Sequence, residues 1–441
     1  MRLHALKNLP ARLALMERCV TQNAFHDRQL LYRDFASQRP EPALESGAQA
    51  LLPLWTFTCE AIAGRNVACM AWNRVRRDML VVGYGSFDFR EQAQGGLVAF
   101  WSLKNPAYPD WIIEVPSGVT SVDFSEASPN LLAVGLYSGS VRVYDVRGSF
   151  ATPGAAQARA DQAPVLESTH ANGKHSDPVW KLRWVGRGTE RGESLMSIST
   201  DGRVTQWSIT KGLEHTDLMK LKRVAGRART SAAGDKSAAG GRGHGYNKQE
   251  AFISRRSSGM TFDFSSRDPS VYLAGTEDGA IHRCSTSYNE QYLESYFGHT
   301  GPVYQIAWSP FSPTHFLSAS ADWTIKLWTE GSDTPQASFQ STSAAVADCQ
   351  WSPVKSTIFG SVTENGKLEV WDLTTSTLKP VVSHAVEGAS FTSLLFSEES
   401  PVLVCGDATG GVRVFRLVGM QGNEVDGAEP ALASVLSRPG A

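Results

Sequence analysis

The chain has 441 residues, 41% of them hydrophobic, a share typical of globular proteins. Lys and Arg number 42 against 44 Asp and Glu, so the net charge of −2 gives no bulk attraction to nucleic acid or to a membrane surface. No stretch reaches the roughly 18 apolar residues of a membrane span, and the N-terminus lacks the apolar core and cleavage site of a secretory signal. The six cysteines are scattered without a Cys-x-x-Cys pair, which predicts free thiols in a reducing cytosol, without a metal framework.

Residues 1–46 are predicted to form a partly helical N-terminal arm. One apolar face follows helical spacing, and its members are Leu13, Met16, Val20, Ala24, Leu31 and Phe35. Pro40 and Pro42 end this pattern. Two roles stay open: the helix packs on the rest of the chain, or it docks a partner.

Residues 47–418 contain a pattern that recurs seven times: an apolar run, a tight polar turn, then alternating apolar residues ending in an aromatic. The clear copies are 194–207, 316–328, 358–373 and 402–415, and the fainter ones are 95–101, 131–146 and 271–284. Successive turns are separated by 44, 63, 77, 44, 43 and 44 residues. A period of about 40–45 residues with strand alternation is typical of propeller blades, so we predict an all-β fold, a seven-bladed WD-repeat β-propeller with a short N-terminal helical arm.

A second repeating segment precedes each turn and ends in an aromatic residue: Trp72, Phe124, Trp184, Phe264, Trp308, Trp351 and Phe396. These segments are predicted to be the innermost strands, and their aromatics should fill the wedges between neighbouring blades. The chain after Leu417 offers no good final outer strand. We therefore expect residues 51–57 to complete the last blade, which leaves no open sheet edge.

The two long intervals contain segments rich in Gly, Ala, Ser and Pro, at 148–173 and 224–250. We predict mobile inserts there and a disordered tail over 419–441. Residues 220–256 carry ten Lys or Arg and two acidic residues, a local charge of +8. This segment is either a solvated insert or a contact for an acidic surface such as a tubulin tail or nucleic acid. No aromatic interleaving supports base stacking, and no nucleic-acid partner is expected.

Two blades carry a His-Ser-Asp-Trp set with the same spacing from Ser to Trp: His175, Ser199, Asp201 and Trp207, then His299, Ser320, Asp322 and Trp328. Such a set matches the hydrogen-bonded tetrad of WD-repeat blades, although His beside Asp and Ser also imitates a hydrolase triad. Because the set repeats, we interpret it as structural. The sixth blade keeps Thr363, Asn365 and Trp371-Asp372 without a matching His.

Motifs for catalysis or cofactor binding are missing from the sequence. The glycine-rich stretch 240–245 lacks the preceding strand and following helix that would cradle phosphate, and no His, Cys or carboxylate cluster has metal-ligand spacing. We expect no catalytic, cofactor-binding or metal residues. A propeller enzyme would need polar residues converging on the central channel, and the innermost strands read as mostly small and apolar.

Several stretches go beyond a generic propeller, namely 47–57, VGYGSFDF (82–89), 102–111, GKHSDPVWKLRW (173–184), 199–207, 275–299 and SADWTIKLW (320–328). In this order they resemble the axonemal dynein intermediate chains, most of all intermediate chain 1 of the outer arm. The resemblance covers about residues 11–417 and implies a non-enzymatic scaffold subunit in the cytoplasm, cytoskeleton and ciliary or flagellar axoneme. A cytoplasmic dynein intermediate chain or another WD-repeat adaptor is the alternative.

The resemblance also implies partners. The propeller would hold the tail of a dynein heavy chain, a second intermediate chain would hold its partner, and microtubule association would be indirect. The N-terminal extension that binds light chains in the family is largely absent from this sequence, and residues 20–23 are the nearest approach to its binding segment. We expect a candidate partner surface at Tyr84, Phe87, Asp88, Phe89, Lys174, Asp177 and Pro178, unless Phe87 and Phe89 only cover a blade edge.

Overall fold

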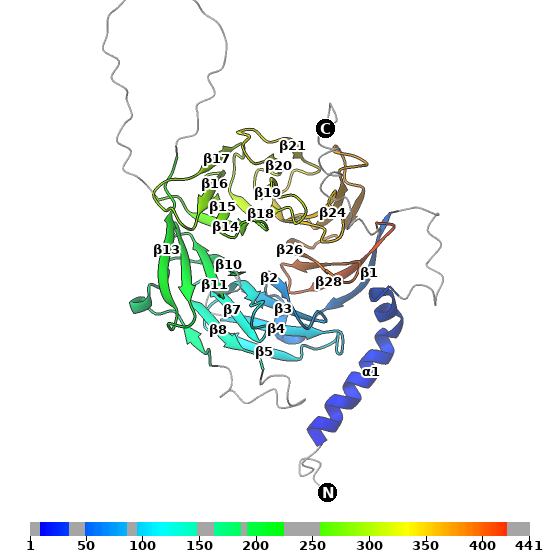
Figure 1. Cartoon of the computed structure of the whole chain (residues 1–441). Coiled ribbons are helices and arrows are strands. Elements are labelled where there is room, and N and C mark those ends of the chain that lie inside the picture. The colour runs from blue at the N-terminus through cyan, green and yellow to red at the C-terminus, as the bar shows by residue number, and fades with distance from the viewer. Residues whose placement is uncertain are drawn as a thin grey trace, which may run out of the picture.

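The computed structural model describes residues 9–34, 49–85, 95–147, 163–186, 192–224 and 256–420. Seven four-stranded antiparallel sheets are arranged as blades around a central axis, and one long helix, α1 (Leu9–Tyr32), lies outside them (Figure 1). The predicted seven-bladed propeller with a helical arm is confirmed.

Each blade runs from an innermost strand outward. The first four blades are β2 (Val67–Trp72), β3 (Met79–Tyr84), β4 (Gly96–Ser102), β5 (Trp111–Val115); β6 (Val119–Phe124), β7 (Leu131–Leu136), β8 (Val141–Asp145), β9 (Leu166–Glu167); β10 (Val179–Gly186), β11 (Glu193–Ser199), β12 (Arg203–Ser208), β13 (Glu214–Lys220); and β14 (Gly259–Phe264), β15 (Val271–Thr276), β16 (Ala280–Ser285), β17 (Glu294–Phe297).

The last three blades are β18 (Val303–Trp308), β19 (His315–Ser320), β20 (Ile325–Thr329), β21 (Ala337–Phe339); β22 (Val346–Trp351), β23 (Ile358–Thr363), β24 (Lys367–Asp372), β25 (Val382–Ala385); and β26 (Phe391–Phe396), β27 (Val402–Asp407), β28 (Val412–Val418) with β1 (Ala50–Phe57). Two short 3-10 helices, η3 (Glu60–Ile62) and η6 (His170–Asn172), lie in loops.

Closure of the ring depends on β1, which pairs antiparallel with β28 so that Leu51 faces Leu417 and Phe57 faces Val412. The N-terminal strand therefore supplies the outermost strand of the seventh blade, as predicted. Since the pairing joins residues more than 350 positions apart, it ties the two ends of the propeller together and covers the edge of β28.

The core lies between the blades. The first strands of neighbouring blades contact one another around the axis, and the largest fully buried side chains include Trp101, Trp207, Trp328 and Trp371. Of the seven predicted wedge aromatics, five are buried, while Trp72 and Trp184 are half-buried. Each such ring removes about 150–250 Å² from water, so neighbouring blades stabilise each other.

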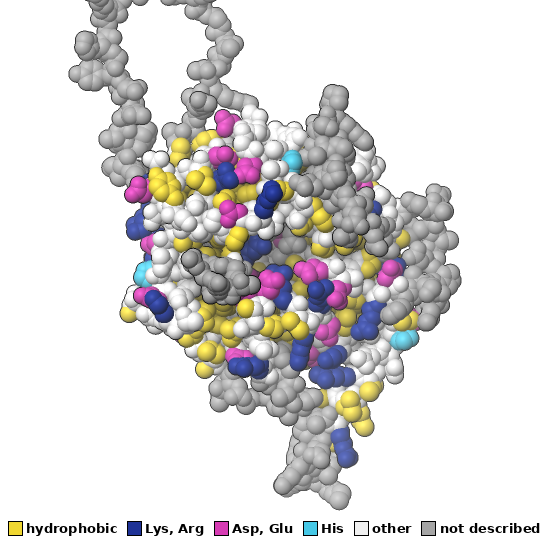
Figure 2. Space-filling view, viewed as in Figure 1, with side chains coloured by type: hydrophobic (Ala, Val, Ile, Leu, Met, Phe, Trp, Pro, Cys, Tyr) yellow, Lys and Arg dark blue, Asp and Glu magenta, His cyan; other side chains and the backbone are white. Residues whose placement is uncertain are grey.

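Helix α1 packs through a different face from the predicted one. Leu13, Met16 and Val20 are 54%, 63% and 68% exposed, and hydrophobic side chains stand free along the lower part of the helix in Figure 2. The packed face contains Phe25 and Tyr32, whose rings contact Trp55 of β1. Of the predicted apolar face, Leu31 packs against the core, Ala24 is exposed, and Phe35 lies outside the described residues.

Polar contacts explain why the more polar face of α1 is the packed one. Gln29 Nε2 donates to the carbonyl of Leu103 at 2.8 Å, Arg18 pairs with Asp110 at 3.3 Å, and Asn105 Nδ2 donates to Glu17 at 3.1 Å. The β4–β5 loop thus offers hydrogen-bonding groups, which an apolar stripe cannot satisfy.

Some predicted boundaries need adjustment. Residues 163–173, placed in the first mobile insert, contain β9 and η6, whereas 148–162 lie outside the described residues. Residues 225–250 of the predicted second insert also lie outside them, as do residues 251–255. Residues 419 and 420, placed in the predicted tail, are part of the described structure, and Met420 is buried in the core; residues 421–441 lie outside the described residues.

Candidate functional site

The first His-Asp set joins the loop before β10 to the β11–β12 turn. His175 Nδ1 lies 2.9 Å from Asp201 Oδ2, and His175 Nε2 lies 2.8 Å from the hydroxyl of Ser197. Trp207 Nε1 donates to the same hydroxyl at 2.8 Å. Since the carboxylate only accepts, Nδ1 carries a proton, and in a neutral ring Nε2 accepts from the serine.

The second set has the same geometry and joins the loop before β18 to the β19–β20 turn. His299 Nδ1 lies 2.9 Å from Asp322 Oδ2 and its Nε2 lies 2.6 Å from Ser318 Oγ, to which Trp328 Nε1 donates at 2.8 Å. The sixth blade keeps only the outer link, in which Trp371 Nε1 donates to Ser361 at 3.1 Å.

The serines in both sets differ from the predicted ones. Ser199 donates instead to the carbonyl of Asp177 at 3.0 Å, and Ser320 donates to the carbonyl of Gly301 at 3.1 Å. Ser197 pairs with Thr205 inside the sheet, which places its hydroxyl beside Trp207, whereas Ser199 ends its strand. The sequence contains a spacing that identifies the correct serines: in three blades the serine that accepts from tryptophan precedes it by ten residues.

Both tetrad carboxylates are held ionised. Burial alone would raise the pKa of Asp201, but hydrogen bonds and charge from His175 and Arg203 outweigh it and hold the pKa well below its usual range. Burial would likewise raise the pKa of Asp322, but the hydrogen bonds from His299 and Thr324 outweigh burial and hold this pKa below its usual range. Ser197 and Ser318 are completely buried and already accept from tryptophan, so these hydroxyls cannot reach a substrate and the sets tie loops to blades.

The predicted partner surface is only partly at the surface. Tyr84 is fully buried, and its hydroxyl accepts from Trp101 Nε1 at 3.4 Å, so its assignment to a partner surface was wrong. Asp177 is exposed, and Lys174 and Pro178 are half-exposed, all in the loop that leads into β10. Phe87, Asp88 and Phe89 lie outside the described residues.

The basic segment is described only at its two ends. Lys220 lies 3.6 Å from Asp217, and Arg223 lies 2.8 Å from Asp278. Lys222 and Arg256 form an isolated β-bridge, whose backbone pairing brings the ends of the segment together. Part of the predicted positive charge is therefore balanced within the propeller.

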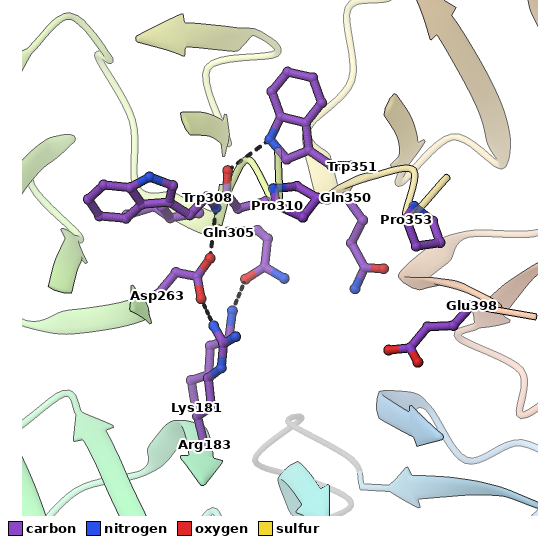
Figure 3. A pocket seen from close by; sticks show the side chains of 12 residues that line it. Lys181, Arg183, Asp263, Gln305, Trp308, Pro310, Gln350, Trp351, Pro353 and Glu398 are labelled. Atoms are coloured by element: carbon purple, nitrogen blue, oxygen red, sulfur yellow. Dashed lines mark hydrogen bonds and ion pairs between the residues drawn. The ribbon is translucent and has the colours of Figure 1, made fainter. Parts of the chain in front are cut away.

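The central channel is more polar than the sequence suggested. A cavity of about 550 Å³ opens at the end that carries the turns after the innermost strands. Figure 3 shows the side chains that converge on it: Lys181, Arg183, Asp263, Gln305, Gln350 and Glu398. In Figure 2 basic and acidic side chains lie interspersed across the middle of the molecule, so no field of one sign surrounds this opening.

These channel groups connect neighbouring blades. Asp263 pairs with Arg183 and accepts from the backbone N–H of Trp308 at 2.7 Å, and Lys181 Nζ donates to Gln305 at 2.5 Å. Asp348 accepts from the N–H of Leu394 at 2.8 Å. Burial lowers the pKa of Lys181 to about 8 and raises the pKa of Asp348 to about 6. The carboxylates thus link innermost strands, a structural use that weakens the case for a propeller enzyme.

Two further features bear on function. The described residues contain no group of three or more His, Cys, Asp or Glu side chains placed to hold a metal ion. Nor does any helix of the described ranges combine the length and apolarity that crossing a membrane requires.

Comparison with known proteins places the chain in a family. Residues 290–329 match the family described as WD domain, G-beta repeat. The chain is 43% identical over 414 residues to "Dynein axonemal intermediate chain 4" of Xenopus laevis, which covers 90% of this chain and 52% of the relative. It is 35% identical over 412 residues to "Dynein, 78 kDa intermediate chain, flagellar outer arm" of Chlamydomonas reinhardtii, covering 92% of this chain and 56% of the relative.

The resemblance to intermediate chain 1 in particular is weaker. Identity to "Dynein axonemal intermediate chain 1" of Bos taurus is 32% over 407 residues, with 91% of this chain and 53% of the relative covered. The chain spans about half the length of the curated relatives it matches. Dynein intermediate chains are non-catalytic structural subunits, in agreement with the structural interpretation of the tetrads. Through its propeller, the chain belongs to the WD-repeat family of axonemal dynein intermediate chains.

Proposed function

We propose that this chain is a non-catalytic scaffold subunit of an axonemal dynein arm. It binds the tail of a dynein heavy chain and works beside a second intermediate chain, so that the motor is assembled and anchored for ciliary or flagellar beating. The observation that carries the proposal is the similarity to axonemal dynein intermediate chains over about nine-tenths of the chain.

The architecture supports this role physically. A propeller closed by β1 and linked by carboxylates across its innermost strands transmits force with little bending. Its loops at both ends offer broad surfaces, as a protein partner requires. The more specific assignment to the outer arm is supported by the 35% identity to the flagellar outer-arm intermediate chain of Chlamydomonas.

The test is co-purification from ciliated cells. We expect the tagged chain, isolated from salt-extracted axonemes, to bring down dynein heavy chains and one further intermediate chain in fixed proportion. Lysine cross-linking with mass spectrometry then identifies which subunits touch the propeller. Recovery with cytoplasmic dynein, or with chromatin or signalling factors and without any dynein heavy chain, would refute the proposal.

A further inference from the structure

One turn of the propeller holds a tryptophan where other blades hold glycine. The turn between the second and third strands places its third residue in the left-handed region in five blades, at φ values of 75–96°, and these residues are Gly139, Gly202, Gly279, Gly366 and Gly410. In the fifth blade the same position is Trp323, at φ 71°. A bulky residue in this region is a strong exception.

The fold itself does not explain this tryptophan. An L-residue in the left-handed conformation costs about 1–2 kcal/mol, which glycine would avoid. Trp323 is nevertheless 47% exposed, so a large part of its ring faces solvent. A strained residue with an exposed aromatic side chain suggests a role in recognition, because such strain is retained where function uses it.

A second aromatic ring lies at the same end of this blade. Tyr304 follows the first residue of β18 at a bulge, since the register with β19 shifts between Val303 and Gln305, and its side chain is half-exposed. Burial raises the pKa of Tyr304, and the carboxylate of Glu364 from the next blade raises it further. Trp323, Tyr304 and Glu364 define what we call the tryptophan patch.

The Asp and Glu side chains in the loops around the tryptophan patch make these loops acidic. The loops at this end of the fifth, sixth and seventh blades are 298–302, 321–324, 340–345, 364–366, 386–390 and 408–411. They contain Asp322, Glu364 and Glu387 but no Lys or Arg. The carboxylate of Asp322 is hydrogen-bonded to His299, whereas Glu364 and Glu387 are exposed. Basic side chains at this end include Lys174, Lys222 and Arg223 of the third and fourth blades, and the half-exposed Lys367 at the start of β24.

We propose that the tryptophan patch binds a basic segment of the dynein heavy chain, with an aliphatic side chain against Trp323 and a Lys or Arg facing Glu364. Aromatic residues dominate binding energy at protein interfaces, and a guanidinium or ammonium group also interacts favourably with the face of an indole ring. The inference rests on the proposed function, because it names the face and the side chains through which the chain would hold that partner.

The decisive variant is Trp323→Gly in the full chain. The probe is dynein heavy chain from a salt extract of axonemes, titrated onto immobilised wild-type or variant protein. Affinity should fall at least about tenfold, as for a central aromatic contact, while thermal stability is unchanged or raised because the left-handed strain is relieved. The matched control is Tyr288→Ala, a 42% exposed aromatic in the β16–β17 loop, at the opposite end of the neighbouring fourth blade, which should leave affinity unchanged.

Charge reversal tests the sign of the partner. Glu364→Lys should weaken heavy-chain binding several-fold and flatten its dependence on salt, whereas Glu364→Gln should have an intermediate effect. Equal binding by wild type and Trp323→Gly, or stronger binding by Glu364→Lys, would overturn this inference alone. If wild-type protein retains no heavy chain, the proposed function itself fails, so the two failures are distinguishable.

Discussion

At the scale of single residues, the tetrads show how a short motif is completed across strands. His175 and Asp201 were identifiable from spacing, yet the serine between histidine and tryptophan is Ser197. The residue two positions later, Ser199, holds the loop carbonyl of Asp177. Both serines stabilise the same loop, but only one is enclosed between two aromatic rings.

This difference predicts unequal effects of two similar substitutions. Ser197→Ala leaves the indole N–H of Trp207 and Nε2 of His175 buried without a partner, which should lower the free energy of unfolding by about 1–3 kcal/mol. Ser199→Ala removes one bond to a loop carbonyl and should cost about 1 kcal/mol or less. Urea unfolding followed by tryptophan fluorescence measures both; a larger loss for Ser199→Ala would contradict the assignment.

The tetrad carboxylates also predict acid sensitivity. The pKa values of Asp201 and Asp322 are depressed in the folded protein. Their stabilisation is therefore fully present above the unfolded value of about 3.9 and is lost as the pH falls toward the folded values. We expect the free energy of unfolding to drop steeply below about pH 4. The double variant Asp201→Asn/Asp322→Asn should be less stable at neutral pH and should show a shallower decline in denaturant titrations across this range.

At the scale of elements, α1 shows that a hydrophobic stripe does not always mark the buried face. The exposed stripe contains Leu13, Met16 and Val20, whereas Tyr32 is 4% exposed against Trp55. Just beyond the helix, Asp34 pairs at 2.6 Å with Arg416 of β28, whose side chain is almost completely buried. The helix is thus anchored at its C-terminal half to the closing strands.

Two sets of substitutions test this orientation of α1. Replacing Leu13, Met16 and Val20 together by Ser should change the stability of the isolated chain by less than about 0.5 kcal/mol per site, because these side chains are already in water. Tyr32→Ala should cost about 3 kcal/mol or more, because it opens a cavity beside Trp55. Calorimetry measures the stability of both variants. A large loss of stability in the triple variant would mean that the side chains of Leu13, Met16 and Val20 are buried within the chain.

At the scale of the whole molecule, closure by β1 makes the ring a single unit. The seventh blade is four-stranded only because residues 50–57 return to β28, and the core there includes Leu54, Trp55 and Phe57. Without that strand, β28 would present an unpaired edge and lose the apolar cover on one side.

A pair of truncations tests closure. A chain lacking residues 1–48 keeps β1 and should remain monomeric and unfold in one transition, although with lower stability because α1 no longer covers Trp55. A chain lacking residues 1–57 should self-associate or lose its cooperative transition, since the β28 edge is free to pair with another chain. Light scattering and calorimetry report the difference. Equal behaviour of the two chains would show that the β1–β28 pairing is dispensable.

The sequence by itself determined the number of blades, their order and the closing strand, because these follow from local periodicity and turn chemistry that repeat along the chain. The sequence also carries the family resemblance, although identity to intermediate chain 4 (43%) is higher than identity to intermediate chain 1 (32%), the member that the sequence stretches had indicated. Periodicity is a property of one segment, so it cannot show which partner segment lies opposite.

Tertiary structure decided the features that depend on such partners. The register between β11 and β12 places Ser197, and not Ser199, beside Trp207. Hydrogen-bonding groups in the β4–β5 loop determine which face of α1 packs against the propeller. Convergence of seven innermost strands brought Lys181, Asp263 and Gln305 together in the channel, although each strand alone reads as mostly apolar. Only the backbone angle of Trp323 distinguished it from an ordinary turn residue, since strain and exposure are set by three-dimensional geometry.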